Sequence, residues 1–235
     1  MVLRKDYIKA DTHVHFSSDI REGRITADKL LEEMSMKGVD GAIVLVHAIP
    51  KTYIKDYHRI KKFCKHYSNL IPGVEINKEV NLTLNDKNYA IKCHTTYLGE
   101  IPAEDIDHGS WFSHVNKPGG LFDEANRAKI DEKFFLENIS KNFVIESTAD
   151  LFNALSLKSM GFKTLLGTDA HPDKKGEYKY LGHNGIIINS TDFNYKNFME
   201  ALKSDEFGYF SIIGSNYYYI TLDCFLEDKI IIKKN

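Results

Sequence analysis

Histidine and carboxylate residues stand where the short apolar runs of this sequence end. His13 and His15 form an HxH pair after the first run, Glu75 follows another, and Asp169 and His171 form a DxH pair after a later one. The remaining residues of this kind are His47, His94, His114 and Glu146. Imidazole and carboxylate groups are ligands of zinc, iron and manganese in proteins. The pattern therefore predicts a centre for divalent metal ions.

The spacing of these residues suggests how they would share the ions. Side chains two positions apart on a strand point the same way, so His13 and His15 can bind one ion together. Glu75 has two carboxylate oxygens and can bridge two ions, which would share a hydroxide at neutral pH. Taken alone, His47 fits a hydrogen-bonded core histidine, and Glu146 fits a helix-capping carboxylate. Seven successive runs that end in such residues favour one common site.

The apolar runs alternate with helix-like patterns, which is typical of β-α units around a parallel sheet. We expect strands over residues 7–10, 41–46, 71–76, 89–93, around 112, 143–146, 164–166 and 185–188. We expect helices over residues 25–37, 53–67, 123–140, 151–160 and 194–203, and a C-terminal β-hairpin from residues 217–225 and 230–233. In a β/α barrel the carboxyl ends of all strands meet at one face. Such a barrel would bring the histidines and carboxylates together.

The composition is that of a globular protein. Of the 235 residues, 43% are hydrophobic and 27% are charged, which excludes a disordered chain. We find neither a linker-like segment nor a strict repeat, so we expect one domain over residues 1–235. With 31 basic and 33 acidic residues, the formal net charge is −2. No overall field therefore favours nucleic acid or anionic lipid as a partner.

The spacing of the cysteines and the length of the apolar runs indicate in which cellular compartment the protein is expected. Cys64, Cys93 and Cys224 are far apart and show no CxxC spacing, so they indicate neither a disulfide framework nor a cysteine-rich zinc module. The first residues lack the apolar segment of a secretory signal. No apolar run approaches the roughly 20 residues of a transmembrane helix. We expect a cytoplasmic protein with no membrane partner.

Five segments together resemble a known enzyme family. They are the DTHVHFSSD segment at 11–19, GVEI at 73–76, His94 with YLG at 97–99, His114 before Pro118, and GTDAH at 167–171 with Gly176. In order and spacing, from about Ala10 to Gly176, these motifs resemble the PHP (polymerase and histidinol phosphatase) family of metal-dependent phosphoesterases. The resemblance implies a distorted (β/α)7 TIM-like barrel with two or three metal ions in its mouth.

The resemblance also implies which residues hold each ion. His13, His15, Glu75 and Asp169 would hold the first ion, and Glu75 would bridge to the second. His94 and His114 would complete the second site. A third ion would be held by Asp19, His47 and His171.

Three departures from the family pattern accompany this assignment. Val46 stands before His47 where the family usually has an Asp, and His114 is followed by VNKP where the family often has His-Pro and then an Arg. Both changes would weaken substrate binding. Asp19 lies closer to the HxH pair than its family counterpart does, which would cost the third ion.

The leading functional hypothesis is hydrolysis of a small phosphomonoester, similar to the reaction of a histidinol phosphatase. A metal-bridging hydroxide would attack phosphorus in line, with Glu75, Asp169 and His171 as the catalytic residues and either His171 or the third metal ion stabilising the leaving oxygen. A cationic side chain would bind a non-reacting phosphate oxygen. The candidates for this substrate contact are Lys117, Arg21 and Arg24. No basic stripe with interleaved aromatic residues is visible, which favours a small substrate over nucleic acid.

Two other functions remain open at this point. An amidohydrolase-type metal enzyme would normally bridge its metals with a lysine, and no lysine stands at the end of an apolar run here. A non-catalytic scaffold that keeps its metal ions would account for the altered motifs around His47 and His114. Turnover of aryl phosphates against amides or lactones separates the two enzymes, and substitution of Glu75 separates an enzyme from a scaffold.

Overall fold

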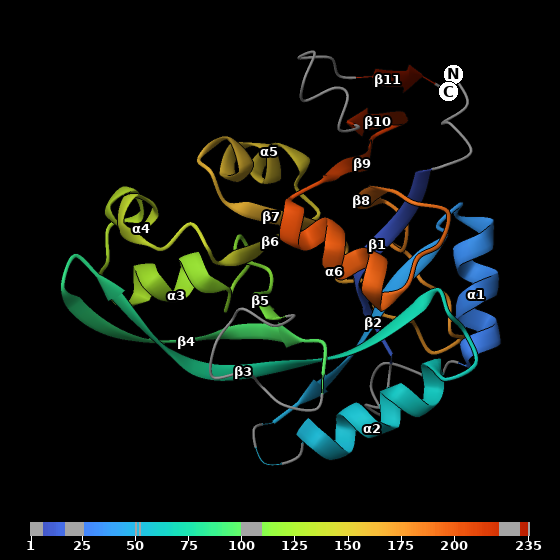
Figure 1. The fold of residues 1–235 in the computed structure, drawn as a ribbon, viewed down its shortest axis with the longest axis horizontal. Helices are drawn as coiled ribbons and strands as arrows, with labels where there is room; N and C mark the ends of the chain where they lie inside the picture. Colours follow the sequence, from blue (N-terminus) through green and yellow to red (C-terminus); the bar gives the residue numbers. More distant parts are fainter. Residues whose placement is uncertain are drawn as a thin grey trace.

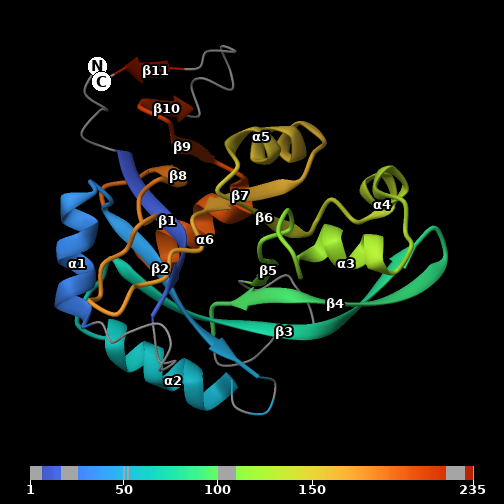
Figure 2. The same ribbon diagram turned by 180° about the vertical axis from the view of Figure 1, so that it is seen from behind.

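The computed structural model describes residues 7–16, 26–49, 51, 53–99, 110–220 and 231–234, and these residues form one mixed sheet with helices packed around it (Figures 1 and 2). The eleven strands are β1 (Tyr7–His15), β2 (Gly41–Ala48), β3 (Leu70–Leu84), β4 (Lys87–Tyr97), β5 (Ser110–Phe112), β6 (Val144–Thr148), β7 (Lys163–Gly167), β8 (Asn184–Asn189), β9 (Phe207–Ile213), β10 (Asn216–Ile220) and β11 (Ile231–Lys234). Their order in the sheet is β11-β10-β9-β8-β1-β2-β3-β4-β5-β6-β7.

The prediction of a distorted (β/α)7 TIM-like barrel is wrong. β4 runs antiparallel to both of its neighbours, β3 and β5, and β8 to β11 are all paired antiparallel. Parallel strands need a crossover connection, whereas antiparallel strands can be joined by a two-residue turn. The alternation of apolar runs and helical patterns revealed neither the direction of β4 nor the antiparallel pairing of β8, because an apolar run looks the same in either direction.

The sheet nevertheless curls, so that the segment after β7 reaches back to β1. The backbone N–H of His15 donates to the carbonyl of Ala170 at 2.8 Å, and the N–H of Ala170 donates to the carbonyl of His13 at 3.1 Å. This contact joins two strands that lie six places apart in the sheet order. It brings the ends of β1 and β7, with their histidines, to the same place.

β3 and β4 form a long curved hairpin that extends beyond the rest of the sheet (Figure 1). The turn of this hairpin is formed by Asn85 and Asp86, which have φ angles of 46° and 61°, a conformation that Asn and Asp tolerate and that two-residue hairpins favour. The hairpin is covered by α3, and its Leu82 and Ile91 belong to one apolar cluster with Leu121 of that helix. The long β3 therefore continues well past Glu75.

Six helices pack on the sheet in the described part of the chain. They are α1 (Ala27–Met36), α2 (Tyr53–Cys64), α3 (Leu121–Arg127), α4 (Glu132–Asn138), α5 (Leu151–Ser159) and α6 (Tyr195–Ser204). The helix expected over residues 123–140 is divided into α3 and α4. Lys129 has a φ angle of 59° between them, and the Asp131 side chain caps α4 by accepting from the N–H of Phe134.

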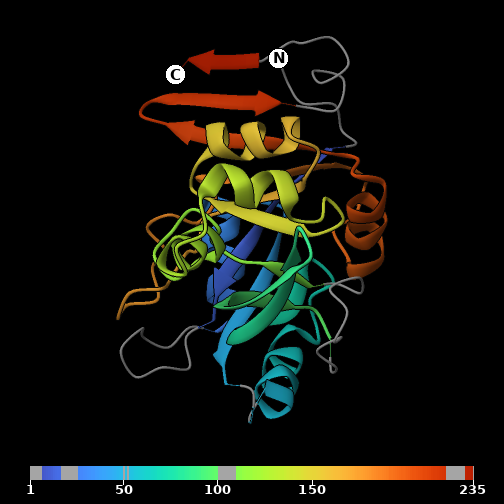
Figure 3. The same cartoon turned by 90° about the vertical axis from the view of Figure 1, so that its left-hand side faces the viewer.

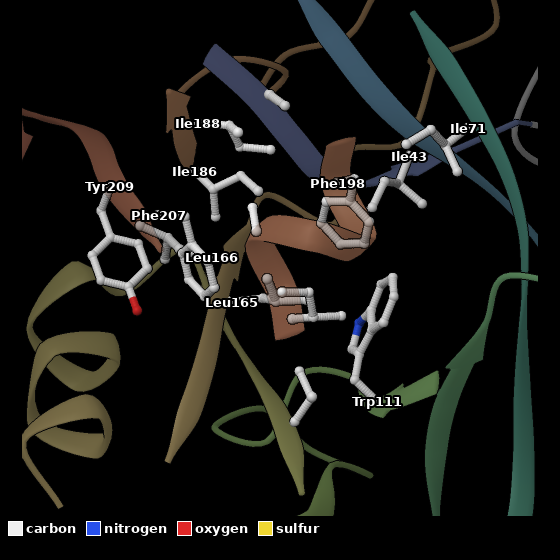
Figure 4. Close-up of a cluster of buried hydrophobic side chains, with 14 of the residues drawn as sticks. Ile43, Ile71, Trp111, Leu165, Leu166, Ile186, Ile188, Phe198, Phe207 and Tyr209 are labelled. Carbon is white, nitrogen blue, oxygen red and sulfur yellow. The ribbon is translucent and has the colours of Figure 1, made fainter. Parts of the chain in front are cut away.

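The central strands are buried on both faces, as the unbroken apolar run at residues 41–46 predicted. Ile43 and Leu45 face a cluster that includes Phe198 of α6, while Val44 and Val46 face α1 and α2. Figure 4 shows the first cluster, in which the indole of Trp111 lies close to Phe198. The candidate metal ligands on β1 and β3 are therefore held by strands that are closely packed on both faces.

The C-terminal part extends the sheet beyond β1 with antiparallel strands. The pairing expected between the two tail strands is confirmed in β10 and β11, and β9, which the sequence pattern did not reveal, joins them to β8. Figure 3 shows these strands, in red, at the edge of the molecule farthest from α2. Among the described residues, no helix is both long enough and apolar enough to cross a membrane.

Candidate metal centre

Eight of the nine predicted metal ligands converge on one site. His13 and His15 lie on β1, His47 on β2, Glu75 on β3 and His94 on β4; the others, His114, Asp169 and His171, lie in the segments after β5 and β7. Glu75 and His94 do not lie at strand ends: both lie within the long β3–β4 hairpin, where His94 pairs with Asn77. The ninth predicted ligand, Asp19, lies outside the described residues.

Glu75 lies at the centre of the site. Its Oε1 is 2.6 Å from Nε2 of His114 and 3.3 Å from Nδ1 of His94, and its Oε2 is 3.1 Å from Nδ1 of His47 and 3.4 Å from Nε2 of His15. Its side chain is 1% exposed. A carboxylate with two imidazole nitrogens beside each oxygen is placed to share two ions.

Asp169 forms a second centre on the open side of the site. Its Oδ1 is 3.0 Å from Nε2 of His171 and 3.2 Å from Nε2 of His15, and its Oδ2 is 3.0 Å from Nζ of Lys117. Lys117 is thus the predicted substrate residue that the structure brings to the site. The other two, Arg21 and Arg24, lie outside the described residues.

The donor set fits metal ions. Both oxygens of Glu75 and Nδ1 of His94 are buried and have no hydrogen-bond partner among the described residues. In addition, Nε2 of His13 lies 3.0 Å from Nε2 of His15. Buried polar atoms without partners are costly, and a shared cation would satisfy them.

Four overlapping groups of ligand atoms each lie within 4.8 Å of one another. They are His13, His15 and Glu75; Glu75, His94 and His114; His15, His47 and His171; and His13, His114 and Asp169. A buried cluster of His, Glu and Asp residues that can hold metal ions is therefore present. The first three groups correspond to the three sites that the family resemblance implied, except that Asp169 is grouped with His13 and His114 and that Asp19 lies outside the described residues.

The charges of the site shift its protonation in the metal-free protein. Burial favours the neutral forms, but His13 and His114 outweigh it at Glu75 and hold the pKa of that carboxyl well below its usual range. Burial likewise opposes the charged form of His13, but Glu146 and Glu75 raise its pKa well above the ordinary value. At His15 burial dominates and lowers the pKa. A neutral His15 and an ionised Glu75 are the forms that bind metal.

The backbone is strained at two of the ligands. His114 has a φ angle of 43° and Asp169 one of 55°, in the left-handed region that most residues avoid. Each lies close after a strand, where the turn directs its side chain into the ligand cluster: His114 contacts Glu75, and Asp169 contacts His15 and His171. Strain of this kind persists only where the surroundings hold it, and it gathers at functional sites.

Asp11 holds the two strands of the site together. It is fully buried and accepts hydrogen bonds from the N–H of His13 at 3.1 Å and from the N–H and hydroxyl of Thr168. Its partners lie on β1 and just after β7, next to the HxH and DxH motifs. The sequence placed Asp11 before the HxH pair but did not indicate this role.

Glu146 lies behind the cluster and does not face its centre. It is fully buried on β6 and contacts Nδ1 of His13 at 3.0 Å, while the indole N–H of Trp111 donates to its Oε2 at 2.8 Å. The helix-cap alternative is wrong, because Asp150 caps α5. Trp111 and Thr148, which also contacts Glu146, were not recognised as site residues from the sequence. No spacing motif marks either of them.

The comparisons with known proteins leave the family open. No protein-family model matches the chain, and no curated protein matches it.

Proposed function

We propose that the protein is a metal-dependent phosphoesterase that hydrolyses a small phosphomonoester, the activity that the PHP-like motifs imply. The observation that carries the proposal is the environment of Glu75, a buried carboxylate whose two unpartnered oxygens face imidazoles from four strands or loops. Two or three divalent ions are the group that fits this environment. Zinc, iron and manganese all accept such ligands.

Divalent ions bound in this way lower the pKa of water and neutralise charge on phosphoryl oxygens. The chain's own residues then hold and orient the components. Glu75 and Asp169 supply negative charge that keeps the ions in the site. His171, with 32% of its side chain exposed, lies at the open side, where it can donate a proton to a leaving alkoxide.

Lys117 is the residue that we assign to the phosphate. Its ammonium lies 3.0 Å from Oδ2 of Asp169, and 36% of its side chain is exposed. If Asp169 held a metal ion, its carboxylate would pair less with Lys117, and the Lys117 ammonium could then contact a phosphate oxygen. A lysine here takes the role that the family often gives to an arginine, with a point charge in place of a two-pronged contact.

The bridging position favours a phosphoesterase over an amidohydrolase-type enzyme. The residue between the imidazoles is Glu75, and Lys117 contacts Asp169 at the side of the cluster. A lysine that bridged two metals would have to lie where Glu75 does.

The first test is metal content by elemental mass spectrometry on protein purified without chelator or nickel resin, followed by an aryl-phosphate assay. We expect two to three equivalents of metal and turnover. Turnover of amides or lactones in place of phosphates would favour the amidohydrolase alternative. Protein that binds no metal, even after reconstitution, would contradict the proposal.

Substitution of Glu75 tests whether the centre is catalytic. Glu75→Gln removes the charge between the ions, and we expect it to abolish turnover while the protein stays folded by circular dichroism. Glu79→Gln is the matched control, because Glu79 is exposed on the same strand, and it should leave turnover unchanged. Metal bound without turnover on any phosphate ester in the wild type would favour the scaffold alternative.

A further inference from the structure

Glu146 is a buried charge that the proposed reaction does not use. Carboxylates are seldom fully buried unless they are paired and hydrogen-bonded, and Glu146 has no exposed surface. It lies on β6, next to the apolar cluster of Trp111, on the side of His13 that faces away from Glu75. Its three hydrogen-bond partners show what it does.

The first partner is His13. Both oxygens of Glu146 lie 3.0 Å from Nδ1 of His13. A carboxylate accepts hydrogen bonds only, so Nδ1 must carry a proton. The neutral His13 ring then has its lone pair on Nε2, the atom 3.8 Å from Oε1 of Glu75.

The second partner leads to His114. The hydroxyl of Thr148 donates to Oε1 of Glu146 at 3.3 Å and lies 3.3 Å from Nδ1 of His114. Since the only proton of the hydroxyl is directed at the carboxylate, its oxygen accepts from His114 Nδ1–H. His114 is therefore also left with its lone pair on Nε2, which lies 2.6 Å from Oε1 of Glu75.

The third partner is Trp111, whose indole N–H donates to Oε2 of Glu146 at 2.8 Å. An indole is a donor only, so this contact fixes the carboxylate without competing for either imidazole. The neighbouring strand also makes room for it. A Cβ at Gly167 would lie 2.9 Å from Oε1 of Glu146 and 2.8 Å from Cβ of His13, closer than real side chains approach.

We propose that Glu146 is a positioning residue that sets the tautomers of two metal ligands, His13 directly and His114 through Thr148. Both rings are thereby held with Nε2 toward Glu75: His13 in the ligand group that includes His15, and His114 in the group that includes His94. The inference rests on the proposed metal-dependent function, but it concerns the ligands and not the reaction. Outer carboxylates of this kind orient imidazole ligands and raise their basicity.

The test measures tautomers and zinc affinity on the full chain. In long-range proton–nitrogen spectra of the ¹⁵N-histidine-labelled protein, we expect His13 and His114 to carry a proton on Nδ1, in both the metal-free and the zinc-loaded states. Glu146→Gln should lower zinc affinity, measured by competition with a chromophoric chelator, by about 10–100-fold. Thr148→Val should lower it less and change the signals of His114 only.

Glu33→Gln is the control, because Glu33 is another buried carboxylate whose ion-pair partner is Lys29. It should leave zinc affinity and both tautomers unchanged. If Glu146→Gln does not fold, the wild-type spectra and Thr148→Val still decide the matter. Absence of a proton on Nδ1 of His13, or unchanged zinc affinity in a folded Glu146→Gln, would overturn the inference. Zinc binding with the expected tautomers but no phosphatase turnover would contradict the proposed function alone.

Discussion

His13 and His47 both direct an imidazole nitrogen at Glu75, but the protein holds the two rings in different ways. His13 is fully buried, and its second ring nitrogen hydrogen-bonds to Glu146 at 3.0 Å. His47 has 48% of its side chain exposed and stacks on His15 with 4.1 Å between ring centroids. Among the described residues, none hydrogen-bonds to its Nε2. Buried residues contact the ring of His13 at both nitrogens, whereas the described residues contact the half-exposed ring of His47 at Nδ1.

The same contrast divides the whole centre into two groups. We call His13, His15, Glu75 and His114 the inner ligands, because none has more than 6% of its side chain exposed. We call the residues with 28–48% of the side chain exposed the rim residues: His47, His94, Lys117 and His171. Two fully buried carboxylates, Glu146 and Asp11, hydrogen-bond to His13 and hold this inner ligand in place. We therefore expect the inner ligands to provide most of the metal affinity and the rim residues to contact substrate.

The largest difference should appear when one ligand is removed from each group. Structural zinc sites bind with about 10–16 kcal/mol shared among four ligands, so loss of His13 in His13→Ala should cost at least about 10²–10³-fold in zinc affinity. His47→Ala should remove the most weakly bound equivalent only. Chelator competition gives both the affinity and the number of equivalents. Equal losses in the two variants would mean that the division into inner and rim groups has no energetic meaning.

The support of the inner ligands should also make stability depend on pH. Burial raises the pKa of Asp11 to about 7, above the value of about 3.9 in an unfolded chain. A raised folded-state pKa means that the contribution is present below about pH 4 and is lost as the pH rises through about 7. The free energy of unfolding of the chelator-treated wild type should therefore fall by up to a few kcal/mol over this range, relative to Asp11→Asn.

Urea denaturation of both proteins at pH 5 and pH 8 measures this difference. For each protein, the free energy of unfolding at pH 8 is subtracted from that at pH 5. Any effect of the Asp11→Asn substitution that does not depend on pH therefore cancels. Identical pH dependence in the wild type and Asp11→Asn would show that Asp11 does not ionise in this range.

The close packing behind the inner ligands is tested at Gly167. In Gly167→Ala the new methyl would lie 2.8 Å from Oγ1 of Thr12 and 2.9 Å from Oε1 of Glu146. Overpacking of this kind should cost about 1–3 kcal/mol in the free energy of unfolding. Gly99→Ala is the control, because nothing lies within 4 Å of its Cβ position, and it should change stability by less than about 0.5 kcal/mol. Equal stability of the two variants would show that β1 and β6 can move away from Gly167 of β7 to make room for the methyl group.

The smallest effect should come from the rim, at Lys117. Lys117→Met keeps the length of the side chain but removes its charge, and we expect KM for an aryl phosphate to rise about tenfold, the equivalent of one charge-assisted hydrogen bond. The value of kcat should change less, because the contact is made in both the bound substrate and the transition state. A fall in kcat at constant KM would place Lys117 in the chemical step instead.

The candidate ligands were predictable because their chemistry is local in the sequence. In an HxH pair such as His13 and His15, strand geometry alone directs two imidazoles to one side. Glu75 and Asp169 were recognised for a similar reason, as carboxylates beside apolar runs. The structure brings His94 into the same cluster, although that residue lies within an antiparallel strand and not at the end of a parallel one.

The amino-acid sequence by itself determined which side chains can bind metal and that short apolar runs lie beside them. Only the tertiary structure decided the direction of β4, the curl that joins β1 to Ala170, and the placement of Trp111 and Thr148 against Glu146. The physical reason is that apolar periodicity reports burial and not strand direction. The hydrogen bond from Trp111 to Glu146 joins residues 35 positions apart, and no spacing pattern in the sequence marks such a pair. The sequence therefore specified the inner ligands and the rim residues, and the fold specified the residues that hold them in place.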